Sequence, residues 1–533
     1  MRPSPKSIAR RSWTFPALSA AVLLASCASF EDSPEWNPDA SAPPSPHATW
    51  VPPKDGEPTP RSLDDLLSLP PVSDEATPAS ELPSKNTAKR TLQRLDEKVP
   101  PSSAESPLEL SKLIQVALEN NPTTRESWQE ARAAAARLGE SMQPYYPQVN
   151  LEASGGAVKE LLQFPGATGI SRQVQIIPEL EITYILLDFG RRSAVAEEAR
   201  RLLAAANFGF NREIQRVIYE VEASFYEYDA ARALEAAALR NLELANSVRE
   251  DVGRRLDLGL STRPDFLLAR QVQAQAVYDL ESSKVGVNNS LAKLALSMGL
   301  PANTPLHVVE LFDEPLPEEL DRGVDQMIDV ALGERPDLQA QVERLRASEA
   351  RLAKAKADFF PVIGLEGAYG GQWWNYQLSG GGSNFGGGNT GGRVQSLDSI
   401  YQATVVVEWP LFEGFSRLNR VREARANRER EKQRLRALEL EATNQVWSVY
   451  YDYKAAYRKY DYGIALLEAS DEAYLATRES FDVGLSTIDD LLRAESDLAS
   501  ARYTLIGARS ELLSTSAQLG FALGNIQSSS PAP

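Results

Sequence analysis

An internal repeat constrains the fold of this chain more than any other feature, because two copies of one unit are expected to fold alike. Residues 117–122 (ALENNP) recur at 331–336 (ALGERP), and residues 145–147 (YYP) recur at 359–361 (FFP). The shift in residue number is 214 in both cases. We therefore expect two related halves joined in one chain.

Further along, the shift between the copies is larger. Residues 259–262 (GLST) recur at 484–487 (GLST), and residues 296–299 (LSMG) recur at 521–524 (FALG), both with a shift of 225. The second copy is therefore longer than the first, and the glycine-rich run 379–388 is the predicted place for the whole difference. Such insertions are tolerated at loop tips, so we expect an exposed loop there.

Each copy is predicted to contain a helix, two strands joined by a loop, and then two long helices. Alternating apolar and polar residues mark the strand before each long helix. In the first copy the apolar positions are Val174, Ile176, Leu180, Ile182, Tyr184 and Leu186. In the second copy they are Tyr401, Ala403, Val405, Val407 and Trp409. The alternation fits a strand of a transmembrane barrel and a half-buried strand of a soluble sandwich equally well, so both interpretations stay open here.

Proline-free stretches at 191–258 and 416–483 predict two exceptionally long helices. Each would extend roughly 100 Å at ~1.5 Å per residue, which a compact domain cannot hold. A second helix follows each of them, at 265–298 and 490–523, so the chain turns and comes back. Two copies of the repeat supply only four strands, whereas even narrow barrels use about eight, so a barrel would require self-association, and three chains would give twelve strands.

The N-terminal residues 1–26 are typical of an export signal, with a basic start and an apolar stretch at 15–25. Residues 24–27 (LASC) are similar to a bacterial lipobox, which predicts lipidation of Cys27. An ordinary signal peptide with an incidental cysteine is the alternative. Ala28, rather than an acidic residue, indicates onward sorting to the outer membrane.

The segment after Cys27 holds 16 of the 34 prolines of the chain, up to and including Pro107, and is predicted to be a disordered tether. Beyond it no uninterrupted apolar run reaches the ~18 residues of a membrane helix, so a membrane-spanning form would have to be a closed β-barrel. The predicted organisation is a signal peptide (1–26), a lipidated cysteine with its tether (27–107), a first repeat (108–301), a connector (302–323), a second repeat (324–525) and a disordered tail (526–533).

Composition and histidine content exclude several classes of function. A net charge of -17 argues against nucleic acid as a partner, because an acidic surface repels phosphate. The two histidines, His47 and His307, lie far apart in proline-rich segments and provide neither a catalytic base beside a nucleophile nor a metal cluster. We predict a protein that is not an enzyme and uses no cofactor and no metal.

The duplicated motifs resemble those of the TolC-type outer-membrane factors, in particular their lipid-anchored members that serve RND efflux systems. The resemblance covers about residues 108–525. It is carried by motifs that occur twice in the same order: YP/FP before a strand (146–147, 360–361), LDFGRR and LFEGF after a strand (187–192, 411–415), and LGLST and VGLST at the tips (258–262, 483–487). It implies a mixed α and β fold: a trimeric, twelve-stranded transmembrane β-barrel continued by a long α-helical barrel in the periplasm.

The same resemblance implies a passive, gated exit duct in the outer membrane. Its partners would be two further copies of the chain, a periplasmic adaptor, an inner-membrane RND or ABC pump, and outer-membrane lipid. Two alternatives remain: the outer-membrane duct of a type I protein secretion system, and a lipid-anchored periplasmic coiled-coil scaffold without a pore.

Acidic residues at the tips are the candidate gate. Thr262 with Asp265, and Thr487 with Asp490, have the spacing of a helix N-cap pair. The functional hypothesis is that Asp265, Asp490 and the neighbouring Asp489 face the lumen, where trimer symmetry would make rings of carboxylates that attract cations.

The pore aspartate of the TolC type corresponds to Asp490. The next acidic site of that family falls on Arg493 here, which predicts a gate of mixed charge. The tip turns themselves are interpreted either as plain interhelical turns or as adaptor contacts. The residues concerned are Gly259, Leu260, Ser261, Gly484, Leu485 and Ser486.

Residues at the strand–helix transition are a further candidate. Arg191 and Arg192 are expected to contact lipid headgroups, to balance Asp188, or to be a solvated pair. Aromatic residues nearby fit either a membrane–water boundary or packing between strand and helix. They are Tyr145, Tyr146, Tyr184, Phe359, Phe360 and Trp409.

Overall fold

The structure is a computed structural model, and it describes residues 42–52, 107–164, 167–309, 316–381 and 392–525. The signal segment, Cys27 and the C-terminal tail lie outside the described residues. The chain divides into two compact units. One, here called the helical unit, comprises residues up to 132, 210–331 and 445 onward, and the other, the sheet unit, comprises 133–209 and 332–444.

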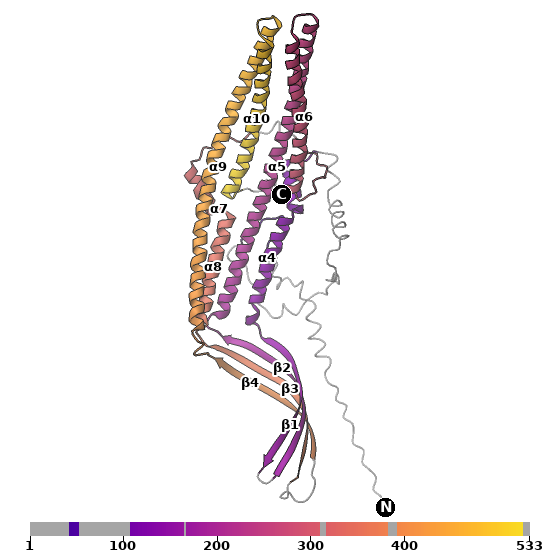
Figure 1. The fold of residues 1–533 in the computed structure, drawn as a ribbon. Coiled ribbons are helices and arrows are strands. Elements are labelled where there is room, and N and C mark those ends of the chain that lie inside the picture. Colours follow the sequence, from indigo (N-terminus) through magenta and orange to yellow (C-terminus); the bar gives the residue numbers. More distant parts are fainter. Residues whose placement is uncertain (1–41, 53–106, 165–166, 310–315, 382–391, 526–533) are drawn as a thin grey trace, which may run out of the picture. The chain divides into compact units, whose positions relative to one another are not determined.

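One antiparallel sheet with the strand order β1-β2-β3-β4 lies in the sheet unit (Figure 1). The strands are β1 (Gln148–Phe164), β2 (Ala167–Leu187), β3 (Val362–Gly381) and β4 (Gly392–Glu408). The prediction of two strands per copy is confirmed, and the β2–β3 pairing joins the copies. In the described part of the chain β1 and β4 each pair with one strand only, so each has an edge of backbone groups that pairs with no other described strand.

One face of the sheet has exposed apolar side chains. The relative exposure of Val174 and Ile176 on β2 is 42% and 50%, whereas the intervening Gln175 is less exposed. On β4 the apolar positions Val405 and Val407 are both 61% exposed. The predicted two-faced alternation is therefore present, but a single chain leaves its apolar face uncovered.

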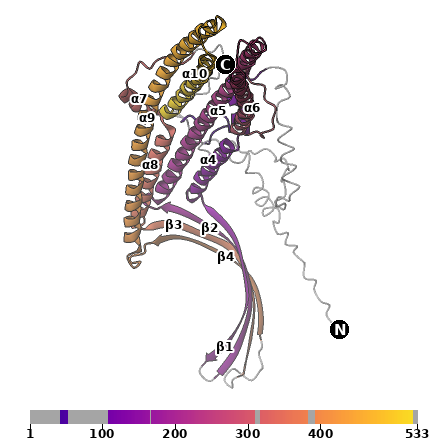
Figure 2. The ribbon, with the colours of Figure 1, turned by 45° about the horizontal axis from the view of Figure 1, so that its top comes forward.

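Eight α-helices of the described chain accompany the sheet, and they repeat in the same order (Figures 1 and 2). The first copy has α3 (Leu110–Asn120), α4 (Pro122–Ser141), α5 (Arg191–Asp257) and α6 (Arg263–Ser297). The second has α7 (Val324–Glu334), α8 (Pro336–Ala357), α9 (Ser416–Asp482) and α10 (Ile488–Leu523). Both α5 and α9 contain 67 residues, which confirms the predicted long helices and the shift of 225 between them. No described helix is both long enough and apolar enough to cross a membrane.

The additional length of the second copy is not all in the glycine-rich run, contrary to the prediction. Three residues, 188–190, connect β2 to α5, whereas seven, 409–415, connect β4 to α9. Four of the extra residues thus lie between strand and helix. The rest fall in the β3–β4 hairpin, whose residues 382–391 lie outside the described part.

Three apolar clusters hold the helical unit together. One is built on α3, α5 and α6 around Phe210 and Phe225, and a second on α7, α9 and α10 around Val446 and Leu512. The third, around Val252 and other residues of α5, α6, α9 and α10, packs the two long hairpins against each other toward their turns. Buried apolar side chains are the main stabilising contribution to such contacts.

A short part of the predicted tether, residues 42–52, is docked on the helical unit. The Asn211 side chain accepts a hydrogen bond from the Trp50 backbone N–H at 2.7 Å and donates one to the Trp50 carbonyl at 2.8 Å. Trp128 Nε1 donates to the Pro43 carbonyl at 2.8 Å. The tether therefore contains at least one segment held by specific contacts.

Candidate functional site

The turn from α5 to α6 forms the first hairpin tip. Gly259 adopts φ +74°, in the left-handed region that favours glycine. Its N–H donates to the Leu256 carbonyl at 2.9 Å, and the Leu260 N–H donates to the Arg255 carbonyl at 2.7 Å, a Schellman arrangement that satisfies the last carbonyls of α5. Gly484 at φ +80° ends α9 with the same pair of bonds. The predicted reversal at each glycine is confirmed.

A capping box starts each return helix. In α6 the Thr262 N–H donates to Asp265 Oδ2 at 2.8 Å, and the Asp265 N–H donates to Thr262 Oγ1. In α10 the Thr487 N–H donates to Asp490 Oδ2 at 3.0 Å, with the reciprocal bond at 3.2 Å. These bonds satisfy backbone donors that a helix start leaves without intrahelical partners. The predicted capping role of both pairs is confirmed.

Capping stabilises the charged form of both aspartates. Hydrogen bonds from the backbone and then the side chain of Thr262 lower the pKa of Asp265 below its ordinary value. For Asp490 the Thr487 hydroxyl is the main cause of the lowered pKa, followed by the Thr487 backbone N–H. Both carboxylates are therefore ionised at neutral pH. Among the described residues no group of three or more His, Cys, Asp or Glu side chains is placed to hold a metal ion, at the tips or elsewhere.

Asp489 and Arg493 form an ion pair one turn apart. Their side chains meet at 2.8 Å, and both are largely exposed. The predicted mixed charge is thus present at the second tip, but Arg493 pairs with Asp489 and not with Asp490 within the described contacts. An exposed pair of this kind contributes little to stability, which leaves it free to rearrange.

A groove of about 320 Å³ lies beside this pair, between α9 and α10. Small residues, Ala469, Ser470 and Ala473, line one side, and Asp490, Arg493, Ala494 and Asp497 line the other. At the corresponding positions the first hairpin has Leu244 in place of Ala469 and the apolar Leu268 in place of Arg493. The two hairpins therefore present different surfaces near their tips.

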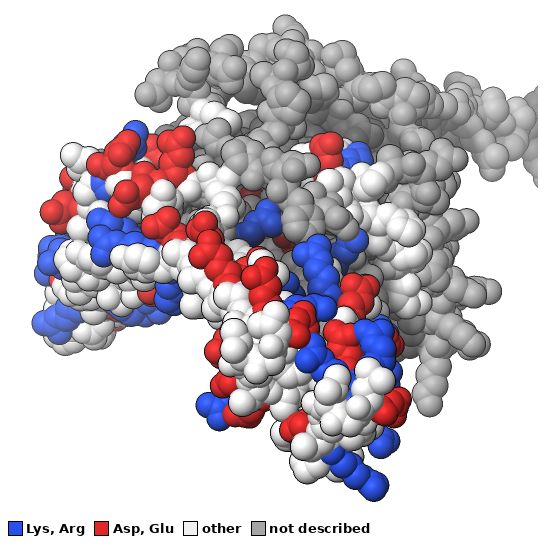
Figure 3. All heavy atoms as spheres, turned by 90° about the horizontal axis from the view of Figure 1, so that it is seen from above, with Lys and Arg blue, Asp and Glu red and all other residues white. Residues whose placement is uncertain are grey.

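Apolar residues of the tip turns are exposed. Leu258, Leu260, Val483 and Leu485 are between 71% and 85% exposed. Viewed from the tip end, acidic and basic side chains both lie on this face of the molecule (Figure 3). The predicted contact residues of the turns, Gly259, Leu260, Ser261, Gly484, Leu485 and Ser486, thus lie at the hairpin ends, where a partner can reach them.

Sequence reasoning missed the contacts that join the two hairpins near the tips. Arg255 of α5 forms an ion pair with Asp482 of α9 at 2.8 Å and donates to the Phe481 carbonyl at 3.2 Å. Arg478 of α9 lies 3.8 Å from Asp251 of α5. Of these residues only Asp482 has a like residue at the equivalent position of the other copy, Asp257, so comparing the copies gave no signal for the two pairs.

In the sheet unit, one arginine per copy fastens the strand–helix transition. Arg192 Nη1 donates to the Pro144 carbonyl at 3.2 Å and to the Ile185 carbonyl at 2.8 Å, and its guanidinium lies 5.0 Å from the centre of the Tyr145 ring. Its Nε lies 3.3 Å from Asp188. Arg192 therefore balances Asp188, one of the predicted alternatives, and is mostly buried.

Arg417 repeats this arrangement in the second copy. It pairs with Glu413 at 2.9 Å, donates to the Asp358 carbonyl at 3.4 Å, and lies 5.8 Å from the centre of the Phe359 ring. Arg191, by contrast, pairs across the copies with Asp358 at 2.9 Å. The repeat signal could have located Arg417, because it corresponds to Arg192 at the shift of 225.

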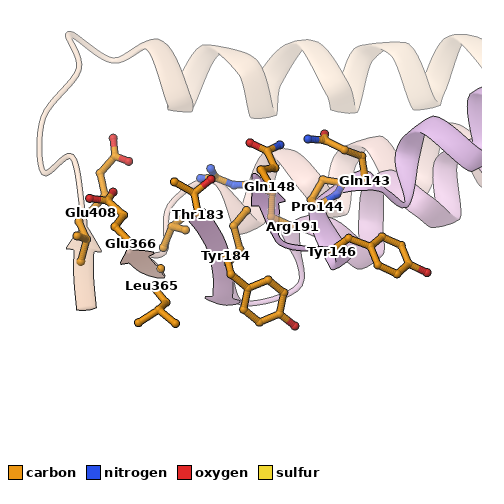
Figure 4. Close-up of a pocket in the computed structure, with 14 residues that line it drawn as sticks. Gln143, Pro144, Tyr146, Gln148, Thr183, Tyr184, Arg191, Leu365, Glu366 and Glu408 are labelled. Carbon is orange, nitrogen blue, oxygen red and sulfur yellow. The ribbon is translucent and has the colours of Figure 1, made fainter. Parts of the chain in front are cut away.

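A cavity of about 440 Å³ lies at the same end of the sheet, and its lining includes residues from both faces of the sheet. Thr183 of β2 is the register partner of Glu366 of β3, and Tyr184 is the partner of Leu365. Thr183 and Glu366 point to one side of the sheet, whereas Tyr184 and Leu365 point to the other (Figure 4). The sheet thus has a polar face and an apolar face at this end.

Predicted boundary aromatics gather here with exposed rings. Phe359, Phe360 and Trp409 are 43%, 51% and 55% exposed. Trp409 Nε1 donates to the Phe359 carbonyl at 3.1 Å, and Phe189 stacks on Phe360 at 5.4 Å between ring centres. The rings contact one another but are not buried in a core within this chain.

A known protein family shares the duplicated organisation described above. The profile of the family described as "Outer membrane efflux protein" matches residues 113–300 and 327–525. The chain belongs to this family. The resemblance inferred from the repeated motifs is thereby confirmed, and the two matched segments correspond to the two copies.

Among the curated relatives of the chain, some have names that state efflux and others have names that state secretion or no role. Protein CyaE of Bordetella pertussis is 27% identical over 87% of this chain and 91% of its own length. The toluene efflux pump outer membrane protein TtgF of Pseudomonas putida is 29% identical over 49% of this chain. The alkaline protease secretion protein AprF of Pseudomonas aeruginosa is 26% identical over 51%. The chain spans about half the length of TtgF and AprF, 54% and 53%.

The fold is shared with solved outer-membrane channels. The Campylobacter jejuni CmeC outer membrane channel superimposes with a TM-score of 0.64 and 17% identity, over 87% of this chain and 95% of CmeC. At this identity the likeness shows the fold alone. It confirms the predicted mixed α and β architecture of two repeats.

Proposed function

We propose that this chain is the outer-membrane channel subunit of an efflux system, a passive and gated exit duct. The state of the sheet supports this proposal most strongly. Its apolar face is exposed, its polar face lies on the opposite side, and neither outer edge is paired within the described chain. Lipid covers an apolar face, and a water-filled lumen suits a polar one. An edge in lipid is costly because its backbone groups lack partners.

Three copies would satisfy these requirements. If β4 of one subunit pairs with β1 of the next, the four strands of each chain join into a closed barrel of twelve. Closure removes both edges. The exposed rings of Phe359, Phe360 and Trp409 then fit the membrane–water boundary, where amphipathic rings are favoured.

The hairpin tips would form the inner mouth. Asp490 and the Asp489–Arg493 pair are the proposed gate, because three-fold symmetry would repeat each charge around the axis. Asp265 would add a carboxylate from the first hairpin. The exposed turns 258–262 and 483–487 are the proposed contacts of a periplasmic adaptor.

A pump would provide the energy for transport, and a lipid would provide the membrane anchor. An inner-membrane pump of the RND or ABC type would supply energy and most of the substrate choice. A lipid on Cys27 would anchor the chain in the outer membrane. We assign no catalytic step to the chain, in keeping with its family.

A second candidate is the outer-membrane duct of a type I protein secretion system. The similarity to AprF, whose name describes protease secretion, favours it. The two candidates share the fold and differ in the pump. Cross-linking in the native host followed by purification of the chain identifies the inner-membrane partner: an RND pump supports efflux, and an ABC exporter supports secretion.

Single-channel recording tests the duct itself. The full-length protein, reconstituted in planar bilayers, is expected to give discrete, cation-preferring currents and to migrate as a heat-sensitive trimer on gels. A monomer without currents would support the third interpretation, a lipid-anchored scaffold without a pore.

A further inference from the structure

Glu495 is a carboxylate buried in the apolar contact between the two long hairpins. The face of α10 that packs inward consists otherwise of apolar residues, Ile488, Leu491, Leu492 and Leu498. Glu495 lies on the same face and is only 4% exposed. A charge at such a position is costly unless it is paired and hydrogen-bonded.

The first copy has no such residue. The corresponding position in α6, at the shift of 225, is Arg270, and its side chain is exposed. A buried carboxylate at this position is therefore specific to the second hairpin, the one that also carries Asp490 and Arg493. Repetition of the unit alone does not account for it.

One carboxyl oxygen of Glu495 has no hydrogen bond among the described residues to compensate for its burial. Its Oε2 is buried and accepts no hydrogen bond in the described part of the chain. Arg478 of α9 is near enough to favour the charged form, but no ion pair between them lies within the described contacts. A lone buried acceptor of this kind is rare in native cores.

The ionisable groups around Glu495 already have other partners. Arg478 donates to the Tyr474 hydroxyl at 3.1 Å and lies 3.8 Å from Asp251 of α5. Arg502, two turns further along α10, donates to Asn241 of α5 at 2.8 Å. Pairing Arg478 with an ionised Glu495 would compete with its contact to Asp251, which now joins α9 to α5.

Burial raises the pKa of Glu495 to about 7, and Arg478 only partly opposes this. The ordinary value is 4.5. A carboxyl whose pKa is higher in the packed than in the loosened state favours packing fully below about pH 4.5. That contribution is lost as the pH rises through about 7.

We propose that Glu495 makes the packing of the two hairpins near their tips proton-dependent. The neutral carboxyl lets α10 pack against α5 and α9, and the ionised carboxylate loosens this contact. Control of the inner mouth by pH would follow from it and rests on the proposed function. The packing change itself does not.

Hydrogen exchange of the full-length protein tests the packing change directly. Protection of peptides from residues 470–498 is measured at about pH 5.5 and about pH 8, with labelling times corrected for intrinsic exchange. The opening equilibrium of the wild type should increase on the order of tenfold over this range. In Glu495→Gln, which keeps the shape but cannot ionise, it should stay at the low, acid-form value.

Glu222 of α5 is the matched control, because burial also raises its pKa to about 7. Glu222→Gln should leave the pH response of the tip peptides unchanged. If Glu495→Gln does not fold, Glu495→Met supplies a second neutral side chain of similar size, with the same expected result. The proposal is overturned if the neutral variants respond to pH as the wild type does, or if Glu222→Gln alone removes the response. These readouts need no conducting channel, so failure of the pore assignment leaves them interpretable.

Discussion

At the scale of single residues, the repeat conserves roles more closely than residue types. The backbone enters α5 through Phe189 (φ 53°) and Gly190 (φ 93°), and enters α9 through Gly414 (φ 58°) and Phe415 (φ 65°). The order of glycine and phenylalanine is reversed, yet both copies use two consecutive left-handed residues, which are strained for phenylalanine. The packing of Arg192 and Arg417 against the preceding segment fixes this bend in each copy.

Arg417→Ala should destabilise the sheet unit. Arg417 is 8% exposed, so its loss removes the donor to the carbonyl of the buried Asp358, at a cost of about 1–3 kcal/mol. Thermal unfolding of the purified protein measures this. Arg420→Ala is the matched control, since Arg420 binds the same Glu413 carboxylate from an exposed position and should change stability by less than about 1 kcal/mol. Equal effects of the two variants would remove the anchoring role of Arg417.

Asp490 has two assigned roles that can be separated. Asp490→Asn keeps a side-chain acceptor for the cap but removes the charge, so it should retain the protection of the first turn of α10 while lowering cation preference in bilayer recordings. Asp489→Asn breaks the ion pair with Arg493 and serves as the comparison. Unaltered ion preference in Asp490→Asn would limit this residue to capping.

The cap also predicts a pH dependence. Because hydrogen bonds lower the pKa of Asp490, its contribution is present above the ordinary value of 3.8 and is lost as the pH falls through the lower value in the folded state. Amide protection at the start of α10, measured in wild type and in Asp490→Asn, should converge at strongly acidic pH. A constant difference down to the lowest pH would contradict this. The expected direction is opposite to that of Glu495.

At the scale of elements, the sequence predicted which helices and strands form but not all of their connections. Shared patterns at shifts of 214 and 225 located both long hairpins and both pairs of strands. The glycine-rich run suggests one insertion for the whole length difference between the copies. Four of the extra residues instead lie in the connection 409–415, whose LFEGF motif is similar to the motif of the shorter connection in the first copy. A motif comparison aligns residue types, and only backbone angles show which positions correspond.

Substitution of Gly484 tests the left-handed turn that ends α9. A Cβ at Gly484 would meet no atom within 4 Å, so Gly484→Ala isolates the cost of the left-handed backbone, about 1–2 kcal/mol. Gly507 lies inside α10 and also has open space around it. Gly507→Ala should therefore stabilise by about 1 kcal/mol. The same sign for both variants in chemical denaturation would contradict the assigned tip geometry.

At the scale of the whole molecule, the sequence indicated a channel but not the contacts that join its two long hairpins near the tips. The number of strands and the lengths of the helices predicted self-association in a channel, and the family to which the chain belongs is one of outer membrane efflux proteins. Contacts such as Arg255–Asp482 and the buried Glu495 depend on how two hairpins lie side by side, which no periodicity within one hairpin encodes. The position of the hairpin turns and their caps could therefore be predicted from sequence, whereas the contacts between the hairpins could not.

The proposed barrel depends on pairing of β4 with β1 of a neighbouring subunit, which engineered disulfides can detect. In a Cys27→Ala background, one cysteine replaces Glu152 on β1 and a second is moved through residues 398–404 of β4. Mild oxidation of the membrane-embedded protein should yield covalent trimers at one or two neighbouring positions and only monomers at the rest, because backbone pairing fixes the register. Monomers at every position would contradict the account.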